Sequence, residues 1–117
     1  MKNFTIFSGT SNKKLSDDIC TYTTDTLGNL QIEKFKDGEI LPTFHESVRG
    51  QSIYIVQTTN TSDAIVETML ILDAAKRAGS KEITLITPYF GYSRQDKVDH
   101  VRSSIGARVM ADTFERG

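Results

Sequence analysis

Two short apolar runs, residues 53–56 and 83–86, flank a segment with helical periodicity, and this arrangement limits the fold more than any other feature of the chain. The first run is apolar at every position, which is typical of a strand that is covered on both faces. The segment between the runs has helix caps at residues 61–63 and a stop signal at Gly79. Its inner face is expected to be the apolar stripe of Ile65, Met69, Leu72 and Ala75. A strand, a helix and a second strand in this order favour a parallel sheet with the helix packed on it.

The beginning of the chain has the same order of a strand followed by a helix. Residues 4–7 predict a short strand, which ends in a Ser-Gly-Thr-Ser turn at residues 8–11. This turn could bind an anion at the start of the next helix, although a plain N-terminal cap is the simpler interpretation. Cys20 is expected to pack as a small apolar group. The positions expected on the buried face of the helix are Leu15, Ile19 and Tyr22.

Between these two units, the sequence predicts a β-hairpin around residues 32–46. Residues 30–35 alternate between apolar and polar side chains, as a half-exposed strand does. The Lys-Asp-Gly sequence at 36–38 is a turn signal, and residues 39–46 can return as the second arm.

The last predicted element is a helix that Ser103 and Ser104 can cap, with Ile105, Val109 and Phe114 facing inward. The resulting fold class is α/β, with a mainly parallel sheet and helices on both faces. In this architecture a helix normally leads to another strand, so we expect the chain to be truncated after this last helix, at residues 113–117. Ligands of such sheets bind at the carboxyl ends of the strands, where the turn at 8–11 and the segment after residue 86 lie.

The segment at 88–97, Pro-Tyr-Phe-Gly-Tyr-Ser-Arg-Gln-Asp-Lys, carries the strongest chemical signal. Aromatic rings and the plane of Arg94 can stack on a base, and Arg94 and Lys97 can hold phosphate charge. Gln95 can hydrogen-bond a base edge or a phosphate oxygen. The segment therefore indicates a nucleotide site, although a solvated loop with aromatics packed on the sheet edge is an alternative.

The composition excludes several classes of protein. With 117 residues the chain is one domain at most, and 14 basic against 15 acidic residues give a net charge of −1. No general positive field therefore draws it to nucleic acid or to an anionic membrane. The chain has no apolar run long enough to cross a bilayer. The lone Cys20 excludes an internal disulfide and fits a reducing cytoplasm.

Five segments in the same order resemble the amino-terminal domain of the ribose-phosphate pyrophosphokinases, also called phosphoribosyl pyrophosphate synthetases. Arg102 and Ile105 match downstream of them. The resemblance implies that residues 1–117 are this amino-terminal domain, with a phosphoribosyltransferase-like fold, and that the carboxy-terminal domain is absent. The matching segments are 6–11, 34–39, 46–50, 54–57 and 92–97.

The resemblance also implies an activity. The family transfers the diphosphoryl group of Mg-ATP to ribose 5-phosphate and makes phosphoribosyl pyrophosphate for nucleotide biosynthesis. It implies a cytoplasmic protein that self-associates as a dimer or a larger assembly. It places no catalytic residue within this chain, and the magnesium of Mg-ATP would have its protein ligands outside the chain. The fragment alone is therefore expected to be inactive.

The resemblance assigns roles to eight residues. Arg94 and Gln95 would bind ATP in one subunit, while Phe35 and Glu39 of a neighbouring subunit would contact adenine. Asp37 stands where relatives carry Asp or Asn. A regulatory phosphate site between subunits would be formed by Ser47, Arg49 and Arg102. After Arg102 the chain reads Ser-Ser-Ile-Gly and lacks the proline that relatives have, which leaves the end of the loop less constrained.

Two other interpretations belong to different classes of protein. A non-catalytic relative could assemble with active synthetases and modulate them, although it would have less need of the adenine contacts of Arg94 and Gln95. A flavodoxin-like interaction module could use the same charged loop only as a docking surface.

Overall fold

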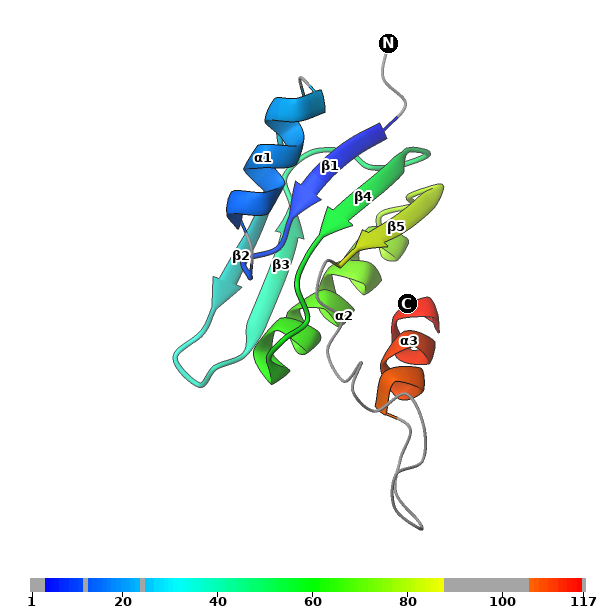
Figure 1. Ribbon diagram of the computed structural model, residues 1–117. Coiled ribbons are helices and arrows are strands. Elements are labelled where there is room, and N and C mark those ends of the chain that lie inside the picture. The colour runs from blue at the N-terminus through cyan, green and yellow to red at the C-terminus, as the bar shows by residue number, and fades with distance from the viewer. Residues whose placement is uncertain (1–3, 12, 24, 88–105, 117) are drawn as a thin grey trace.

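The computed structural model describes residues 4–11, 13–23, 25–87 and 106–116, and its centre is a parallel sheet (Figure 1). The three strands are β1 (Phe4–Ser8), β4 (Ser52–Val56) and β5 (Glu82–Ile86), in the order β1-β4-β5. Ile6 lies opposite Tyr54, which in turn lies opposite Thr84. Both strand pairs are parallel, so the carboxyl ends of the three strands lie at one edge of the sheet.

Helices cover both faces of this sheet, as predicted (Figure 1). On one face, Ile6 and Val56 pack against α1 (Lys13–Thr23), where Cys20 is buried as a small apolar group. On the other face, α2 (Ser62–Arg77) covers the sheet, and α3 (Gly106–Arg116) packs against α2 and β5 through Phe114. The side chains of Phe7, Ile53 and Ile55 are fully buried on this second face. None of the described helices is long and apolar enough to cross a membrane.

The crossover helix α2 begins and ends at the predicted signals. The hydroxyl of Thr61 accepts a hydrogen bond from the backbone N–H of Ala64 at 3.1 Å, which caps the first turn. The chain leaves the helix through Gly79, whose φ of +86° is a conformation that side chains disfavour. The predicted stripe faces inward, with Ile65, Leu72 and Ala75 buried and Met69 half-buried.

The predicted hairpin is present as β2 (Leu30–Lys34) and β3 (Ile40–Phe44), an antiparallel pair joined by a loop of residues 35–39. Its stem belongs to the core, because the ring of Phe44 meets the ring of Phe7 edge to face with centroids 4.9 Å apart. Leu30 and Ile32 pack on the same cluster, and β3 runs alongside α2. The stem is thereby fixed, while the loop extends beyond it (Figure 1).

Two predictions about inward-facing residues are wrong. Tyr22 is 90% exposed. The buried face of α1 is centred on Ser16 and Cys20, and Tyr22 lies two residues after Cys20. Its side chain is therefore rotated by about 200° around the helix axis, away from that face. The inward face of α3 is formed by Met110 and Phe114, which are four residues apart. Val109 precedes Met110 by one residue and is therefore turned away from this face and exposed. Ser103, Ser104 and Ile105 lie outside the described residues.

Candidate functional site

The loop of the hairpin presents Phe35, Asp37 and Glu39 together on the surface. The backbone N–H of Phe35 donates to the carbonyl of Glu39 at 2.8 Å, and the N–H of Gly38 donates to the carbonyl of Phe35 at 2.9 Å. Gly38 has a φ of +94°, which a glycine adopts without strain. All three side chains are exposed, and the ring of Phe35 is 46% exposed. The sequence prediction that one turn presents these side chains is thus consistent with the geometry.

Asp37 has a second role within this loop. Its Oδ1 accepts a hydrogen bond from the backbone N–H of Glu39 at 3.0 Å, which is the side-chain-to-backbone contact that favours Asp in turns. Because one carboxylate oxygen holds the turn, the other remains exposed to solvent. Asp and Asn both supply this acceptor, so either residue can support the same loop conformation.

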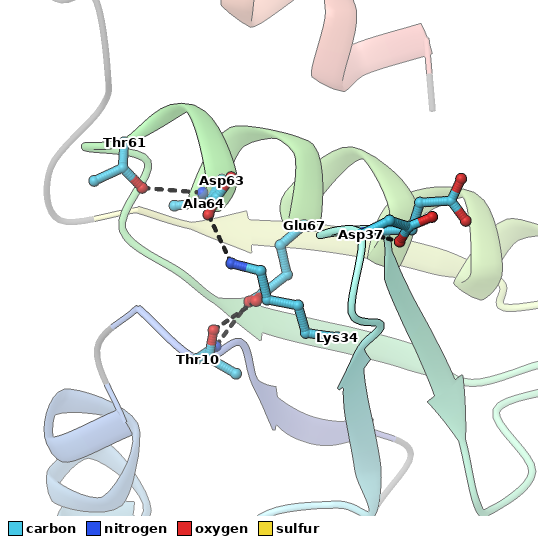
Figure 2. A network of polar contacts seen from close by, with 8 residues as sticks. Thr10, Lys34, Asp37, Thr61, Asp63, Ala64 and Glu67 are labelled. Atoms are coloured by element: carbon cyan, nitrogen blue, oxygen red, sulfur yellow. Dashed lines mark hydrogen bonds and ion pairs between the residues drawn. The ribbon is translucent and has the colours of Figure 1, made fainter.

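The hairpin loop lies toward the carboxyl end of the parallel sheet. Lys34, the last residue of β2, places its Nζ 3.0 Å from Oδ2 of Asp63 in the first turn of α2, which follows the carboxyl end of β4 (Figure 2). A pocket of about 310 Å³ lies between these elements and the turn that follows β1. Its lining residues include Thr10, Ser11, Ile32, Lys34, Ile40 and Glu67. The hairpin therefore adds its exposed loop to the sheet edge where ligands of such folds bind.

A buried polar network organises that edge, and it centres on Gln57 and Glu67. Gln57 is fully buried at the end of β4, and Glu67 of α2 is 4% exposed. The Nε2 group of Gln57 donates to Oε2 of Glu67 at 2.7 Å. The Oε1 atom of Gln57 accepts from the backbone N–H of Ser11 at 3.1 Å and from its hydroxyl at 2.6 Å. The amide thus links the end of β4 to both α2 and the turn after β1.

Glu67 completes the network from the helix side. Its Oε2 accepts from the backbone N–H of Thr10 at 2.8 Å, and its Oε1 accepts from the hydroxyl of Thr10 (Figure 2). The hydroxyl of Ser11 in turn accepts from the backbone N–H of Thr58 at 2.8 Å. The polar groups of Thr10 and Ser11 are therefore bonded to Gln57, Glu67 and Thr58. These contacts join the turn after β1, the end of β4 and α2 into one platform.

The sequence interpretation of this region missed the network. The alternatives considered for the turn, an anion site or a plain helix cap, left out Gln57 and Glu67 as its partners. The available signal was a glutamate within the buried stripe of a helix, because a carboxylate is almost never fully buried unless it has partners. Glu67 lies between Ala64 and Thr68 on the buried face of α2. A carboxylate at such a position needs a hydrogen-bond donor in the interior of the protein.

Replacing Glu67 with alanine should lower the free energy of unfolding by about 3 kcal/mol, because three donors from Thr10 and Gln57 lose a buried acceptor. Glu67→Gln keeps the shape and one acceptor oxygen, so we expect a loss of about 1 kcal/mol. Chemical denaturation of both variants measures the difference. Equal losses for the two variants would mean that the hydrogen bonds do not carry the effect.

Ser47 and Arg49 lie at the opposite end of the sheet, in the turn before β4. Both are exposed. The side chain of Arg49 lies over Gly79 at the end of α2, where a Cβ on Gly79 would come within 3.3 Å of the guanidinium Nη1. The backbone N–H of Gly50 donates to the carbonyl of Gly79 at 2.8 Å. The structure thus separates these two residues from the hairpin loop.

Three predicted site residues, Arg94, Gln95 and Arg102, lie outside the described residues. Strand β5 ends at Ile86, at the same edge as the platform, and the chain continues from there toward Arg94. Within the described ranges, no three side chains of His, Cys, Asp or Glu gather closely enough to hold a metal ion.

The fold and the hairpin are matched by known proteins. Residues 4–117 match the family model described as the N-terminal domain of ribose phosphate pyrophosphokinase. The chain is 44% identical over 115 residues to the ribose-phosphate pyrophosphokinase of Porphyromonas gingivalis, and the match covers 97% of this chain and 37% of that protein. It is 42% identical over 109 residues to the chloroplastic ribose-phosphate pyrophosphokinase 1 of Oryza sativa, covering 92% of this chain and 28% of that protein.

A solved structure agrees with the sequence comparisons. The crystal structure of phosphoribosylpyrophosphate synthetase from Mycobacterium smegmatis superimposes with a TM-score of 0.93 at 32% identity, over 98% of this chain and 39% of that one. The chain therefore belongs to the family of the N-terminal domain of ribose phosphate pyrophosphokinase. Both the resemblance and the α/β fold class predicted from the sequence are confirmed. The chain spans at most 39% of the length of these three relatives.

Proposed function

We propose that this chain forms part of the ATP-binding surface of a protein that transfers diphosphate from ATP to ribose 5-phosphate. One observation carries the proposal: the hairpin presents an exposed aromatic ring and two carboxylates on a packed stem, at the carboxyl end of the parallel sheet. The names of the relatives support the same activity.

The hairpin residues have the chemistry that adenine requires. The ring of Phe35 offers a flat apolar face, and stacking of a base on an aromatic side chain contributes about 1–3 kcal/mol. The exocyclic amine of adenine needs an acceptor, which Glu39 or the free oxygen of Asp37 can supply. Arg94 and Gln95 would bind the phosphates or the base from the loop that follows β5. Diphosphoryl transfer depends mainly on such positioning and on charge neutralisation.

The proposed site is shared between two copies of the chain. Phe35, Asp37 and Glu39 of one copy would meet Arg94 and Gln95 of its neighbour, so nucleotide binding requires self-association. Ser47 and Arg49, at the other end of the sheet, would form a separate regulatory phosphate site with Arg102. Guanidinium groups suit such a site because they bind phosphate through two parallel hydrogen bonds. We place the protein in the cytoplasm.

We further propose that the catalytic step is performed by residues beyond these 117, because the relatives are about three times as long. Magnesium would enter as Mg-ATP, with its protein ligands in that other part. Phe35, Asp37 and Glu39 would then hold and orient the nucleotide.

This division of labour predicts that the chain alone, given Mg-ATP and ribose 5-phosphate, makes no phosphoribosyl pyrophosphate above background. The intact gene product should make it under the same conditions. A coupled assay for phosphoribosyl pyrophosphate measures both proteins side by side. Turnover by the chain alone would contradict the division, and an intact product that binds Mg-ATP without turnover would favour the regulatory relative.

A further inference from the structure

We infer that the ion pair between Lys34 and Asp63 is a positioning element that fixes the hairpin loop over the sheet edge. This inference concerns the hairpin loop to which the proposed function assigns the adenine contacts, and it rests on that proposal only for its effect on nucleotide affinity. The pair joins the last residue of β2 to the first turn of α2, with Nζ and Oδ2 3.0 Å apart (Figure 2).

The base of the hairpin packs on the core, whereas its loop end is exposed. Near its base, Leu30 and Phe44 pack on the core cluster around Phe7. Toward the loop, the side chains of residues 33–39 are all exposed, and the described hydrogen bonds of the loop connect its own residues to one another. Those bonds set the shape of the loop, while its position relative to α2 depends on the stem and on contacts made outside the loop.

A pocket separates the loop half of the hairpin from α2. About 310 Å³ of space lies between Ile32, Lys34 and Ile40 on the hairpin and Thr61, Asp63 and Ala64 at the start of the helix. The side chains of Lys34 and Ile40 do not interlock with the first turn of α2 across this space, so packing restrains the loop less than it restrains the base of the hairpin. Within the part of the chain that the structure describes, the pair of Lys34 and Asp63 joins the hairpin to α2 across this space.

The position of Asp63 favours this contact. A carboxylate in the first turn of a helix is stabilised by the free N–H groups there, so Asp63 is a pre-ordered anchor for the flexible Lys34. The side chains are 57% and 73% exposed, so the pair contributes little to overall stability and is weakened by salt. Its effect should therefore appear in the position of the loop, while the free energy of unfolding stays nearly constant.

The loop position can be measured without any ligand. Spin labels at Lys36→Cys on the loop and at Lys81→Cys, which directly precedes β5, report the distribution of distances between loop and sheet in a Cys20→Ala background. The labelled protein that keeps Lys34 and Asp63 should give one narrow distribution of distances between the labels. Asp63→Asn should broaden it. The charge exchange Lys34→Glu with Asp63→Lys should narrow it again in part, because a cation in the first turn of a helix is less favourable than a carboxylate. A matched control is Asp73→Asn, which removes the equally exposed pair of Asp73 with Arg77 inside α2.

Nucleotide binding by the intact protein supplies the second measurement. Asp63→Asn should raise the dissociation constant for Mg-ATP between about 1.5- and 5-fold at low salt, with no change at high salt and none for Asp73→Asn. The charge exchange should restore part of the affinity, because it re-forms an ion pair between the hairpin and α2 with the charges reversed.

The two measurements separate the inference from the proposed function. A distribution that Asp63→Asn leaves as narrow as before overturns the positioning role, whatever the nucleotide does. A distribution that broadens and is partly restored by the charge exchange, in a protein whose wild type binds no nucleotide, supports the positioning role and refutes the nucleotide site.

Discussion

Replacing Phe35 with alanine should raise the dissociation constant for Mg-ATP in the intact protein roughly 5- to 150-fold. This range corresponds to the stacking contribution of about 1–3 kcal/mol that a base loses when its aromatic partner is truncated. The ring is 46% exposed at the loop of the hairpin, so its removal leaves no cavity in the core. The free energy of unfolding should therefore change by less than about 0.5 kcal/mol. Isothermal titration with Mg-ATP measures the effect.

Leu41 offers a matched control for Phe35. It is also 46% exposed and belongs to the same hairpin, but it lies in β3 opposite Glu33 and outside the loop. Leu41→Ala removes a similar exposed apolar group without touching the proposed adenine contact, so Mg-ATP affinity should be unchanged. If the two variants bind equally well, Phe35 does not stack on the base.

The second large effect is expected at Gly9, where alanine should lower the free energy of unfolding by about 3 kcal/mol. A Cβ at this position would lie 2.1 Å from Oε1 and 2.4 Å from Cδ of Gln57, and 2.8 Å from Oε2 of Glu67. These atoms are buried and hydrogen-bonded, so they cannot move aside without breaking the contacts to Ser11 and Thr10. Overpacking of this kind costs about 1–3 kcal/mol, and the broken hydrogen bonds add to it. Denaturation in guanidinium chloride measures the loss.

Gly38 separates the steric effect from an effect of backbone conformation. Gly38→Ala has open space around its Cβ but a φ of +94°, so it should cost only about 1 kcal/mol, the strain of a left-handed residue. A Gly9→Ala variant as stable as Gly38→Ala would show that the turn after β1 can shift away from Gln57. The platform would then be less rigid than its hydrogen bonds indicate.

Local sequence patterns were sufficient to predict most of the fold. The apolar run at 53–56 predicted a strand covered on both faces. The stripe beginning at Ile65 predicted the crossover helix, because the buried face of a helix recurs every three to four residues. The Lys-Asp-Gly turn predicted the hairpin, since only a few residue types suit a tight turn. Tyr22 and Val109 were misplaced because each stands near an inward-facing position, and a helix turns by about 100° per residue.

The candidate site was predictable only in part. Phe35, Asp37 and Glu39 share one loop, so their proximity follows from the chain itself. The contact of Gln57 with Ser11, 46 residues away, and that of Glu67 with Thr10, 57 residues away, depend on how the sheet brings strand ends together. The ion pair of Lys34 with Asp63 likewise depends on the angle between hairpin and helix. Long-range contacts of this kind follow from tertiary packing, which no local pattern specifies.

Mixing two variants that each impair nucleotide binding tests the shared site most directly. Phe35→Ala and Arg94→Ala each impair every site when present alone. In a mixed dimer, the Phe35→Ala copy supplies an intact Arg94 to the Phe35 of its partner, so one site of two is complete. Random pairing of equal amounts should restore Mg-ATP binding at about one quarter of the wild-type number of sites. Mixing that restores no binding, although mixed dimers form, would contradict a site built by Phe35 and Arg94 from two copies of the chain.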